Sequence, residues 1–563
     1  MRYIQKVQLM SKVLPKQFQH PYAFDERYKK PVVYFSMEFA IDQCLKIYSG
    51  GLGFLAGSHM RSAYELRQNV IGIGILWKKG YYDQTRKEDH SMQVVFSEKL
   101  YYFLEETNIK FKIQIHQHDV WVKAMFLNPE TFGTVPMFFL STDLPENDYL
   151  ACSTTFKLYD SDPNAKIAQT MILGLGGTKL LDKLHYEPDI YHLNEAHAIS
   201  GVFHLYKKWG SVDKVRKKVV FTTHTPEEAG NEKHDINLLH QLSFFDGLSI
   251  EEVKKITGIE DEVFNHSLVA LRMSHMANGV SKLHGEVSRE MWKDYDDICP
   301  ITHITNAQNK KFWADKVLEE ASAKKNHLAL IARKREMKQR LFEEVADQTG
   351  KLFDADICTI VWARRFAEYK RPDLITHDIE RFVKLLENQK RPVQIVFAGK
   401  PYPMDFNAVH MFDNLVFASK KIKNMAVLTG HELKLSRLLK GGADVWMNNP
   451  RVTREASGTS GMTAAMNGAI NFSTNDGWVR EFKDMNQSQV AFVLPTVDHH
   501  LPPFLQDTMD LDNMYEMLEK EILPMYYDTP DKWWDMVKNS MSKVTPYFDS
   551  DRMADEYYTK LYK

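Results

Sequence analysis

Short apolar stretches rich in β-branched residues recur along the chain, and segments of helical periodicity separate many of them. The stretches are VVYFSMEF (32–39), IGIGILW (71–77), VVFTTH (219–224), ICTIVWARR (357–365), QIVFAGK (394–400) and DVWMNN (444–449). An example of the helical pattern is AKIAQTMILGLGGTKLLDKL (165–184). Strands that alternate with helices predict parallel sheets in an α/β protein. Ligands bind at the carboxyl ends of such strands, so polar residues at these ends are the first candidates for chemistry.

The pattern changes near residue 315, where a charged, helix-favouring segment without an obvious strand covers residues 314–346. A new series of strands follows this segment. We therefore predict an N-terminal α/β domain over residues 1–314 and a C-terminal α/β domain over 315–540, which begins with connecting helices at 315–350. A packing helix is expected at 541–563. Two α/β domains that face a cleft suit an enzyme with two substrates.

Composition narrows the possible functions. The 563 residues carry 72 Lys and Arg against 74 Asp and Glu, a net charge of −2, which argues against binding nucleic acid or anionic membranes through bulk charge. The cysteines are scattered without metal-ligand or disulfide-framework spacing, and no metal site is predicted (Cys44, Cys152, Cys299 and Cys358). The chain shows neither a signal-peptide core nor an apolar run of about 18 residues. We expect a cytoplasmic protein.

Two motifs follow strands of the first half. In SGGLGFLAG (49–57), the glycines Gly50 and Gly51 free the backbone, so that N–H groups could face an anion at a helix start. The alternative is an ordinary glycine-rich turn. In HLNEAHA (192–198) and VVFTTHTPEEAG (219–230), the candidates are Asn194, His197 and His224. These side chains could equally serve as structural hydrogen-bonding groups.

Two further motifs lie in the second half. VWARRFAEYKRP (361–372) runs from a strand into cations that could clamp a phosphate or diphosphate, although a solvated basic turn is the alternative (Arg364, Arg365, Lys370 and Arg371). In residues 444–478 a strand leads to a polar loop and a small-residue helix (Glu455, Ser457, Gly458, Thr459, Ser460 and Gly461). Such a helix start could bind an anion, with Glu455 accepting bonds from sugar hydroxyls. The alternative is a helix start capped by Thr459 or Ser460.

Taken in order, these motifs resemble the α-glucan phosphorylases in their short bacterial and archaeal form. The resemblance runs from about residue 30 to 480 through YFSMEFA, YSGGLGFLAG, LNEAHA, FTTHTP, HITNA, RRFAEYKRP, FAGKPYPMD and DVWMNNPR…EASGTSGM…NGA. It implies a GT-B fold of two Rossmann-like domains with the active site between them. It also implies a retaining transfer of glucosyl units between α-1,4-glucan ends and orthophosphate, giving glucose 1-phosphate. The family holds pyridoxal phosphate on a lysine, uses no metal, and commonly forms homodimers.

The resemblance assigns roles to residues at matching positions. Gly50 and Gly51 correspond to the loop at the substrate phosphate, and Asn194 and His197 join the substrate-binding set. The catalytic set is His224, which contacts the glucosyl residue, Arg365 and Lys370, which hold the reacting phosphate, and Glu455. Asn306, Glu455, Ser457 and Gly458 correspond to ligands of glucose hydroxyls. Arg364, Thr459 and Thr463 fall in the cofactor site.

The chain departs from the family at the cofactor lysine, because Thr463 stands where the lysine forms its imine. A threonine has no amine, so covalent attachment at this position is chemically excluded. The next lysine, Lys483, is twenty residues downstream and not an evident substitute. Ala307 replaces a glycine, and Glu227 and Glu228 replace an apolar residue and a proline.

Three hypotheses follow. The first is a phosphorylase-like transferase that holds pyridoxal phosphate without a covalent bond. The second is a glucan synthase-like transferase whose cations grip the diphosphate of a nucleotide sugar. The third is a non-catalytic, glucan-binding pseudo-phosphorylase. The retained polar residues weigh against the third, since drift would erode costly buried polar groups. We expect the first.

Overall fold

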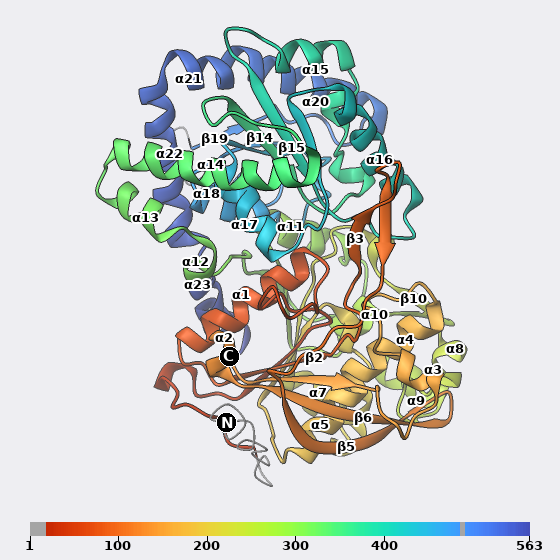
Figure 1. The fold of residues 1–563 in the computed structure, drawn as a ribbon. Coiled ribbons are helices and arrows are strands. Elements are labelled where there is room, and N and C mark those ends of the chain that lie inside the picture. Colours follow the sequence, from red (N-terminus) through yellow and green to blue (C-terminus); the bar gives the residue numbers. More distant parts are fainter. Residues whose placement is uncertain (1–17, 485–489) are drawn as a thin grey trace, which may run out of the picture.

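The computed structural model describes residues 18–484 and 490–563, and within these residues the chain forms two large sheets covered by helices (Figure 1). The first sheet has nine described strands in the order β13-β12-β9-β8-β1-β2-β7-β6-β5. Its strands are β1 (Val32–Phe35), β2 (Val70–Ile75), β5 (Glu105–Ile115), β6 (His118–Leu127), β7 (Met137–Ser141), β8 (Ile190–Asn194), β9 (Val219–Thr222), β12 (Met276–Gly279) and β13 (Ile301–His303). The pairs from β13 to β7 are parallel, whereas β6 and β5 extend the sheet in antiparallel pairing.

The second sheet is wholly parallel, with six described strands in the order β16-β15-β14-β17-β18-β19. These are β14 (Cys358–Ala363), β15 (Val393–Ala398), β16 (Met425–Leu428), β17 (Val445–Asn448), β18 (Ile470–Ser473) and β19 (Ala491–Val493). All six apolar stretches identified in the sequence overlap strands of the two sheets, namely β1, β2, β9, β14, β15 and β17. The prediction of an α/β protein with parallel sheets is confirmed.

The helices of the first half lie between residues 51 and 313. They are α1 (Gly51–Glu65), α2 (Pro129–Phe132), α3 (Tyr149–Ser153), α4 (Pro163–Met171), α5 (Gly177–Lys183), α6 (Gly201–Trp209), α7 (Val212–Lys218), α8 (Ile236–Gln241), α9 (Ile250–Thr257), α10 (His266–Arg272), α11 (Lys282–Met291) and α12 (Lys310–Trp313). The helical segment expected near residues 165–184 consists of α4 and α5, joined by a π-helical stretch at Ile172–Gly176.

The remaining helices accompany the second sheet and the end of the chain. They are α13 (Lys316–Ala323), α14 (His327–Thr349), α15 (Ile379–Leu386), α16 (Phe406–Lys421), α17 (Leu433–Gly442), α18 (Thr459–Met466), α19 (Trp478–Asp484), α20 (Pro503–Met517), α21 (Leu523–Asp528), α22 (Pro530–Tyr547) and α23 (Ser550–Glu556). The charged segment at 314–346 therefore folds into α13 and most of α14. Residue 541, where we placed a boundary, lies inside α22.

The sequence of β14 is apolar without alternation because successive residues are buried on opposite faces of the sheet. Val361 packs in a core that includes α14 and α17, whereas Ile360 and Trp362 belong to a core formed with α15 and α16. Helices thus cover both faces of the sheet, and each strand residue is buried on one side or the other. Since both faces are closed, polar side chains can reach solvent or a ligand at the strand ends.

Two segments connect the sheets. The hairpin of β3 (Asp83–Arg86) and β4 (Met92–Val95) leaves the first half and reaches the second (Figure 1). There Gln84 donates to the carbonyl of Gly399 at 3.0 Å, and the amide of Met92 donates to Asp413 at 2.7 Å. In the opposite direction, the chain returns after α22 to the first half, where α23 packs on α1. A second hairpin, β10 (Lys233–Asp235) with β11 (Val263–Asn265), lies within the first half.

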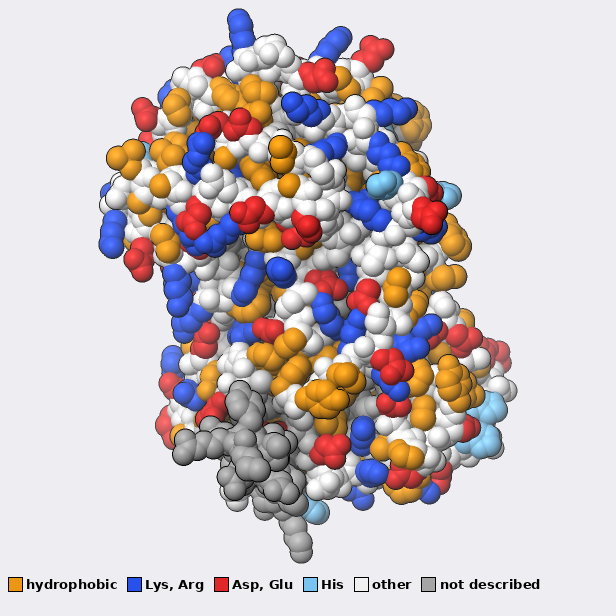
Figure 2. Space-filling model, viewed as in Figure 1, with side chains coloured by type: hydrophobic (Ala, Val, Ile, Leu, Met, Phe, Trp, Pro, Cys, Tyr) orange, Lys and Arg blue, Asp and Glu red, His pale blue; other side chains and the backbone are white. Residues whose placement is uncertain are grey.

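Charges of both signs are interspersed on the face shown in Figure 2, without a large area of one sign. This distribution agrees with the net charge of −2. Among the described helices, none combines the length and apolar character needed to cross a membrane.

Candidate active site

A cavity of about 440 Å³ is lined by residues from both halves of the chain. Its walls are loops that follow strands β8, β9, β14 and β17, together with the N-termini of α1 and α18. Of the fourteen residues that the sequence singled out for the site, thirteen line this cavity: Gly50, Gly51, His197, His224, Asn306, Arg364, Arg365, Lys370, Glu455, Ser457, Gly458, Thr459 and Thr463. Asn194 lies behind the wall. The topology thus brings distant motifs to one place.

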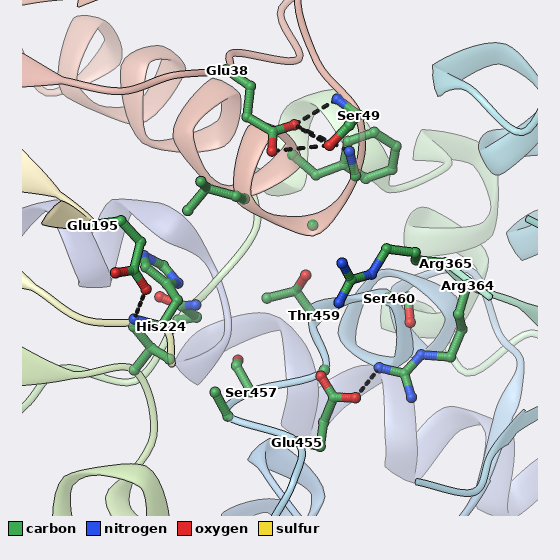
Figure 3. A pocket seen from close by; sticks show the side chains of 18 of the residues that line it. Glu38, Ser49, Glu195, His224, Arg364, Arg365, Glu455, Ser457, Thr459 and Ser460 are labelled. Carbon is green, nitrogen blue, oxygen red and sulfur yellow. Dashed lines mark hydrogen bonds and ion pairs between the residues drawn. The ribbon is translucent and has the colours of Figure 1, made fainter. Parts of the chain in front are cut away.

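The basic motif after β14 meets Glu455 in the cavity wall. Arg364 donates to Oε2 of Glu455 at 2.5 Å, and the Lys370 ammonium donates to the same oxygen at 2.7 Å. Burial alone would raise the pKa of Glu455, but the two cations outweigh it and hold the pKa at about 2. Glu455 is therefore a carboxylate at neutral pH, with Oε1 outside these two bonds. Arg365 is exposed to the cavity and reaches into the space between Ser49 and Thr459 (Figure 3).

Helix α18 begins at this cation cluster. Its N-cap is Gly458, in a left-handed conformation with φ of +85°, and no side chain caps the helix. The alternative in which Thr459 or Ser460 caps the helix is therefore wrong. The hydroxyl groups of these two residues line the cavity beside the first-turn amides, which have no acceptors within the helix. The arrangement suits an anion, because the helix dipole and nearby cations favour negative charge.

His224 follows β9 and is oriented by its neighbours. Its Nε2 lies 2.7 Å from Oδ1 of Asn194, and the Asn194 amide group donates to Ser36. Burial lowers the pKa of His224 to about 3, so the ring is neutral, and Nε2 carries the proton that Asn194 accepts. Asn194, predicted to bind substrate, thus positions His224 instead of lining the cavity.

Glu195 supports the same loop from the end of β8. Its carboxylate accepts bonds from the backbone amide of His224 and from the hydroxyl of Thr225. Burial raises the pKa of Glu195 to about 7. The residue has φ of +63° and ψ of 171°, a region that non-glycine residues adopt only under constraint from their surroundings. Strain of this kind is typical of functional sites. In this conformation, the Glu195 carboxylate lies within bonding distance of the backbone amide of His224.

The glycine loop before α1 is held by a carboxylate. Glu38 accepts bonds from the amides of Ser49 at 2.6 Å and Gly50 at 3.1 Å, and from the Tyr159 hydroxyl at 2.8 Å. The Gly50 amide, which we expected to face the substrate phosphate, is therefore already bonded. A Cβ built on Gly51 would meet nothing within 4 Å, so the cavity is open at this point.

Thr463 lies on the second turn of α18, with its hydroxyl bonded to the carbonyl of Ser460 at 3.0 Å. It is 1% exposed, so the position is deep in the cavity wall. Lys400 lies in the same cavity and is paired with Glu432 at 2.9 Å. His431 is also part of the lining, and burial lowers its pKa to about 3.

Several buried polar atoms of the cavity wall have no hydrogen-bond partner among the described residues: Arg364 Nη1, His431 Nε2, Ser457 Oγ, Ser460 Oγ, Asn306 Oδ1 and His197 Nδ1. Buried polar groups normally have partners, so these atoms indicate where a ligand bonds. The guanidinium of Arg364 and the hydroxyl of Ser460 suit a phosphate, while Asn306 and Ser457 suit sugar hydroxyls. The donor set therefore fits both a phosphate-bearing cofactor and a glucosyl substrate.

One cluster of potential metal ligands adjoins the cavity, formed by Glu232, His234 and His266 with ligand atoms within 4.8 Å of one another. Glu232 is already paired with Lys166, and Nδ1 of His234 lies 2.9 Å from Nε2 of His266. These contacts explain why the three side chains lie close together. The expectation of no metal stays a prediction.

The sequence motifs contained further cavity residues that we did not single out. Glu38 and Glu195 lie within YFSMEFA and LNEAHA, and Lys400 lies within FAGKPYPMD, so their positions after strands were a usable signal. Lys440 and Ser436 also line the cavity from α17. No motif marked these two, since only the packing of α17 directs them there.

Comparisons with known proteins agree with these motifs. A sequence profile of the carbohydrate phosphorylase family matches residues 302–498. The chain is 34% identical to the maltodextrin phosphorylase of Thermococcus litoralis, over 95% of this chain and 71% of that protein. It is 29% identical to the glycogen phosphorylase of Aquifex aeolicus, over 96% of this chain and 87% of that protein. An uncharacterised protein of Methanocaldococcus jannaschii is 45% identical, over 95% and 100% of the two chains.

Proposed function

The chain belongs to the carbohydrate phosphorylase family, and from this we propose that it transfers glucosyl units between the ends of α-1,4-glucan and orthophosphate. Glucose 1-phosphate is the product in the direction of glucan breakdown. The observation that carries the proposal is the cavity itself, where cations and helix amides lie beside carboxylate, amide and hydroxyl groups that can bond sugar hydroxyls. The proposal includes a GT-B arrangement around this cavity, with one domain at 1–314 and a second that begins at 315 and extends through α22, after which α23 returns to the first half.

The role that we propose for each cavity residue follows from its position. Arg365, exposed to the cavity, and Lys370 hold the reacting phosphate, because arginine and lysine donate charge-assisted bonds to phosphate oxygens. Glu455 accepts from sugar hydroxyls through Oε1 while Oε2 stays with Arg364 and Lys370. His224, whose ring is fixed by Asn194, contacts the glucosyl residue. Preorganised donors of this kind stabilise charge that develops during transfer.

Family members normally use pyridoxal phosphate. Arg364, Ser460 and Thr459 fit its phosphate, since Arg364 Nη1 and the Ser460 hydroxyl have no partner among the described residues. Bound there, the cofactor would supply a phosphate group for proton exchange with the reacting phosphate that Arg365 and Lys370 hold. Thr463 cannot form an imine, so at this position the cofactor is held without a covalent bond. Without a covalent bond from any residue, the affinity for the cofactor would fall, because a tether keeps the cofactor at a high effective concentration.

The test is release of glucose 1-phosphate from maltodextrin and orthophosphate, with pyridoxal phosphate supplied and then omitted. We expect release that depends on the added cofactor. Absence of release in both conditions would contradict the proposal. In that event, incorporation of glucose from ADP-glucose or UDP-glucose would identify a nucleotide-sugar-dependent transferase. Glucan binding without either activity would identify a pseudo-phosphorylase.

A further inference from the structure

Three lysines line the cavity, and one of them lacks an acidic partner. Lys370 is paired with Glu455 at 2.7 Å, and Lys400 is paired with Glu432 at 2.9 Å. For Lys440, no carboxylate of the described residues lies within 4.0 Å, although the side chain is 1% exposed. A buried lysine without a partner is costly as an ammonium group. This position therefore calls for an explanation.

Burial disfavours the charged form of Lys440, and the ring face of Trp313 compensates this only in part. Its Nζ lies 3.5 Å from the ring centroid of Trp313, and Phe54 is the next aromatic ring, at 5.4 Å. Burial lowers the pKa of Lys440 well below its usual value, and the charge of Arg437 lowers it further. A lowered pKa increases the share of the neutral amine, which is the nucleophilic form of a lysine. Lysines desolvated in this way form imines with carbonyl compounds.

Lys440 and Thr463 line the same cavity from neighbouring helices. Helix α17, which carries Lys440 one turn after Ser436, packs on α18, which carries Thr463 (Figure 1). Asn467 connects Thr463 with Trp313, whose ring lies beside Lys440. Its side-chain amide donates to the carbonyls of Thr463 at 2.8 Å and Trp313 at 2.9 Å. Lys440 and Thr463 therefore lie on packed helices, and both line one cavity.

We propose that Lys440 forms an imine with the aldehyde of pyridoxal phosphate and so replaces, from helix α17, the amine that Thr463 lacks. The inference rests on the proposed function only for the identity of the aldehyde. The amine nitrogen attacks the carbonyl carbon and a carbon–nitrogen double bond forms. The carbonyl oxygen leaves as water with both amine protons, so no oxidant or other reactant is needed. Arg364 and Ser460 hold the phosphate of the same molecule.

The experiment uses the full chain and pyridoxal phosphate itself. The protein is incubated with the compound, its imine absorption is recorded, and borohydride then reduces the bond so that peptide mapping locates the adduct. We expect the adduct on Lys440. An adduct on another lysine, or none, overturns the inference. Because mapping is done on the unaltered chain, the answer does not depend on whether a variant folds.

Variants sharpen the result. Lys440→Met removes the amine and keeps an apolar side chain of similar length; we expect loss of the imine band and about 10²-fold weaker binding. Lys434→Met, exposed on the same helix, is the matched control and keeps the band. In the double variant Lys440→Met with Thr463→Lys, the imine returns at residue 463. An unchanged band in Lys440→Met would overturn the inference.

Activity separates this inference from the proposed function. Cofactor-dependent release of glucose 1-phosphate without any imine would overturn the role of Lys440 and leave the function standing. An imine on Lys440 in a chain that releases no glucose 1-phosphate would support the role of Lys440 and contradict the function.

Discussion

Arg365 and Lys370 are the side chains on which the proposed phosphate chemistry depends most directly. Each substitution, Arg365→Ala or Lys370→Ala, removes a charge-assisted bond from a preorganised site, and losses of about 10²-fold or more in turnover are expected. The rate of glucose 1-phosphate release measures this loss, and circular dichroism checks that the fold is intact. Arg335→Ala removes an exposed arginine of α14 and serves as the control. Turnover close to that of the unaltered protein in both variants would contradict the site assignment.

Lys370 and Arg364 also show how individual residues serve stability and function together. Both are paired with Glu455, so one buried carboxylate offsets one of the two positive charges. An anion that enters the cavity adds a second acceptor and offsets the positive charge that Glu455 leaves uncompensated. Such a cluster can be buried without a ligand, because each charge has a partner.

The N-terminus of α18 depends on a backbone conformation that suits glycine. Gly458 has φ of +85°, and an added Cβ would lie 3.4 Å from Cγ of Glu455, so Gly458→Ala is expected to cost about 1–2 kcal/mol and displace Glu455 and Thr459. Thermal unfolding measures the first effect and glucose 1-phosphate release the second.

Gly350 provides the matched control for this helix start. It ends α14 with φ of +70° and has nothing within 4 Å of an added Cβ. Gly350→Ala therefore carries the same backbone cost away from the cavity. We expect both variants to lose stability and only Gly458→Ala to lose activity. Equal activity in the two variants would contradict a role of this helix start in binding.

The loop after β18 contains a carboxyl group that makes stability depend on pH. Asp476 accepts bonds from the amides of Glu455 at 2.9 Å and Gly477 at 2.8 Å. Burial, with the nearby charge of Glu455, raises the pKa of Asp476 from 3.8 to about 7. Because the folded-state pKa lies above the unfolded value, the stabilisation is complete below pH 4 and is lost as pH rises through 7.

This rise in the pKa of Asp476 corresponds to a decrease in the free energy of unfolding on the order of 4 kcal/mol between low and high pH. Asp476→Asn removes this titration, so from pH 5 to 8 the melting temperature of the unaltered protein should fall relative to that of the variant. Differential scanning fluorimetry at several pH values measures the difference. Asp531→Asn, at an exposed position of α22, should show no such trend. A pH-independent difference for Asp476→Asn would contradict the raised pKa.

The sequence allowed much of the fold and site to be predicted because both depend on local patterns. Stretches rich in apolar and β-branched residues, such as 357–365, can be recognised without tertiary information, and polar residues at their ends converge where parallel strands end. Lys440 could not be found in this way, because its place in the cavity follows from the packing of α17 on α18. The hydrogen bonds of Gly50 with Glu38 and of Asn194 with His224 could not be predicted from the sequence either, because they also depend on tertiary packing.

The end of the chain connects the two halves of the molecule. After α22, which packs with the second half, the chain returns and contributes Tyr557, Leu561 and Tyr562 to the core of the nine-stranded sheet. The Tyr562 hydroxyl lies 2.6 Å from Nδ1 of His192, on β8. That strand ends two residues later at Asn194, which holds His224. The last residues of the chain therefore support a strand of the candidate active site.

A chain that ends at Tyr547 tests this connection. It loses several fully buried side chains, each worth about 1.5–3 kcal/mol, and the sum is comparable with a total stability of about 5–15 kcal/mol. We expect the shortened chain to be aggregated or partly unfolded, as seen in sedimentation and thermal unfolding. A chain lacking only the exposed Lys563 is the control and should behave like the full chain. Tyr562→Phe removes one hydrogen bond and should cost about 1 kcal/mol. A shortened chain with an unchanged melting temperature would show that the first sheet is stable without the returning segment.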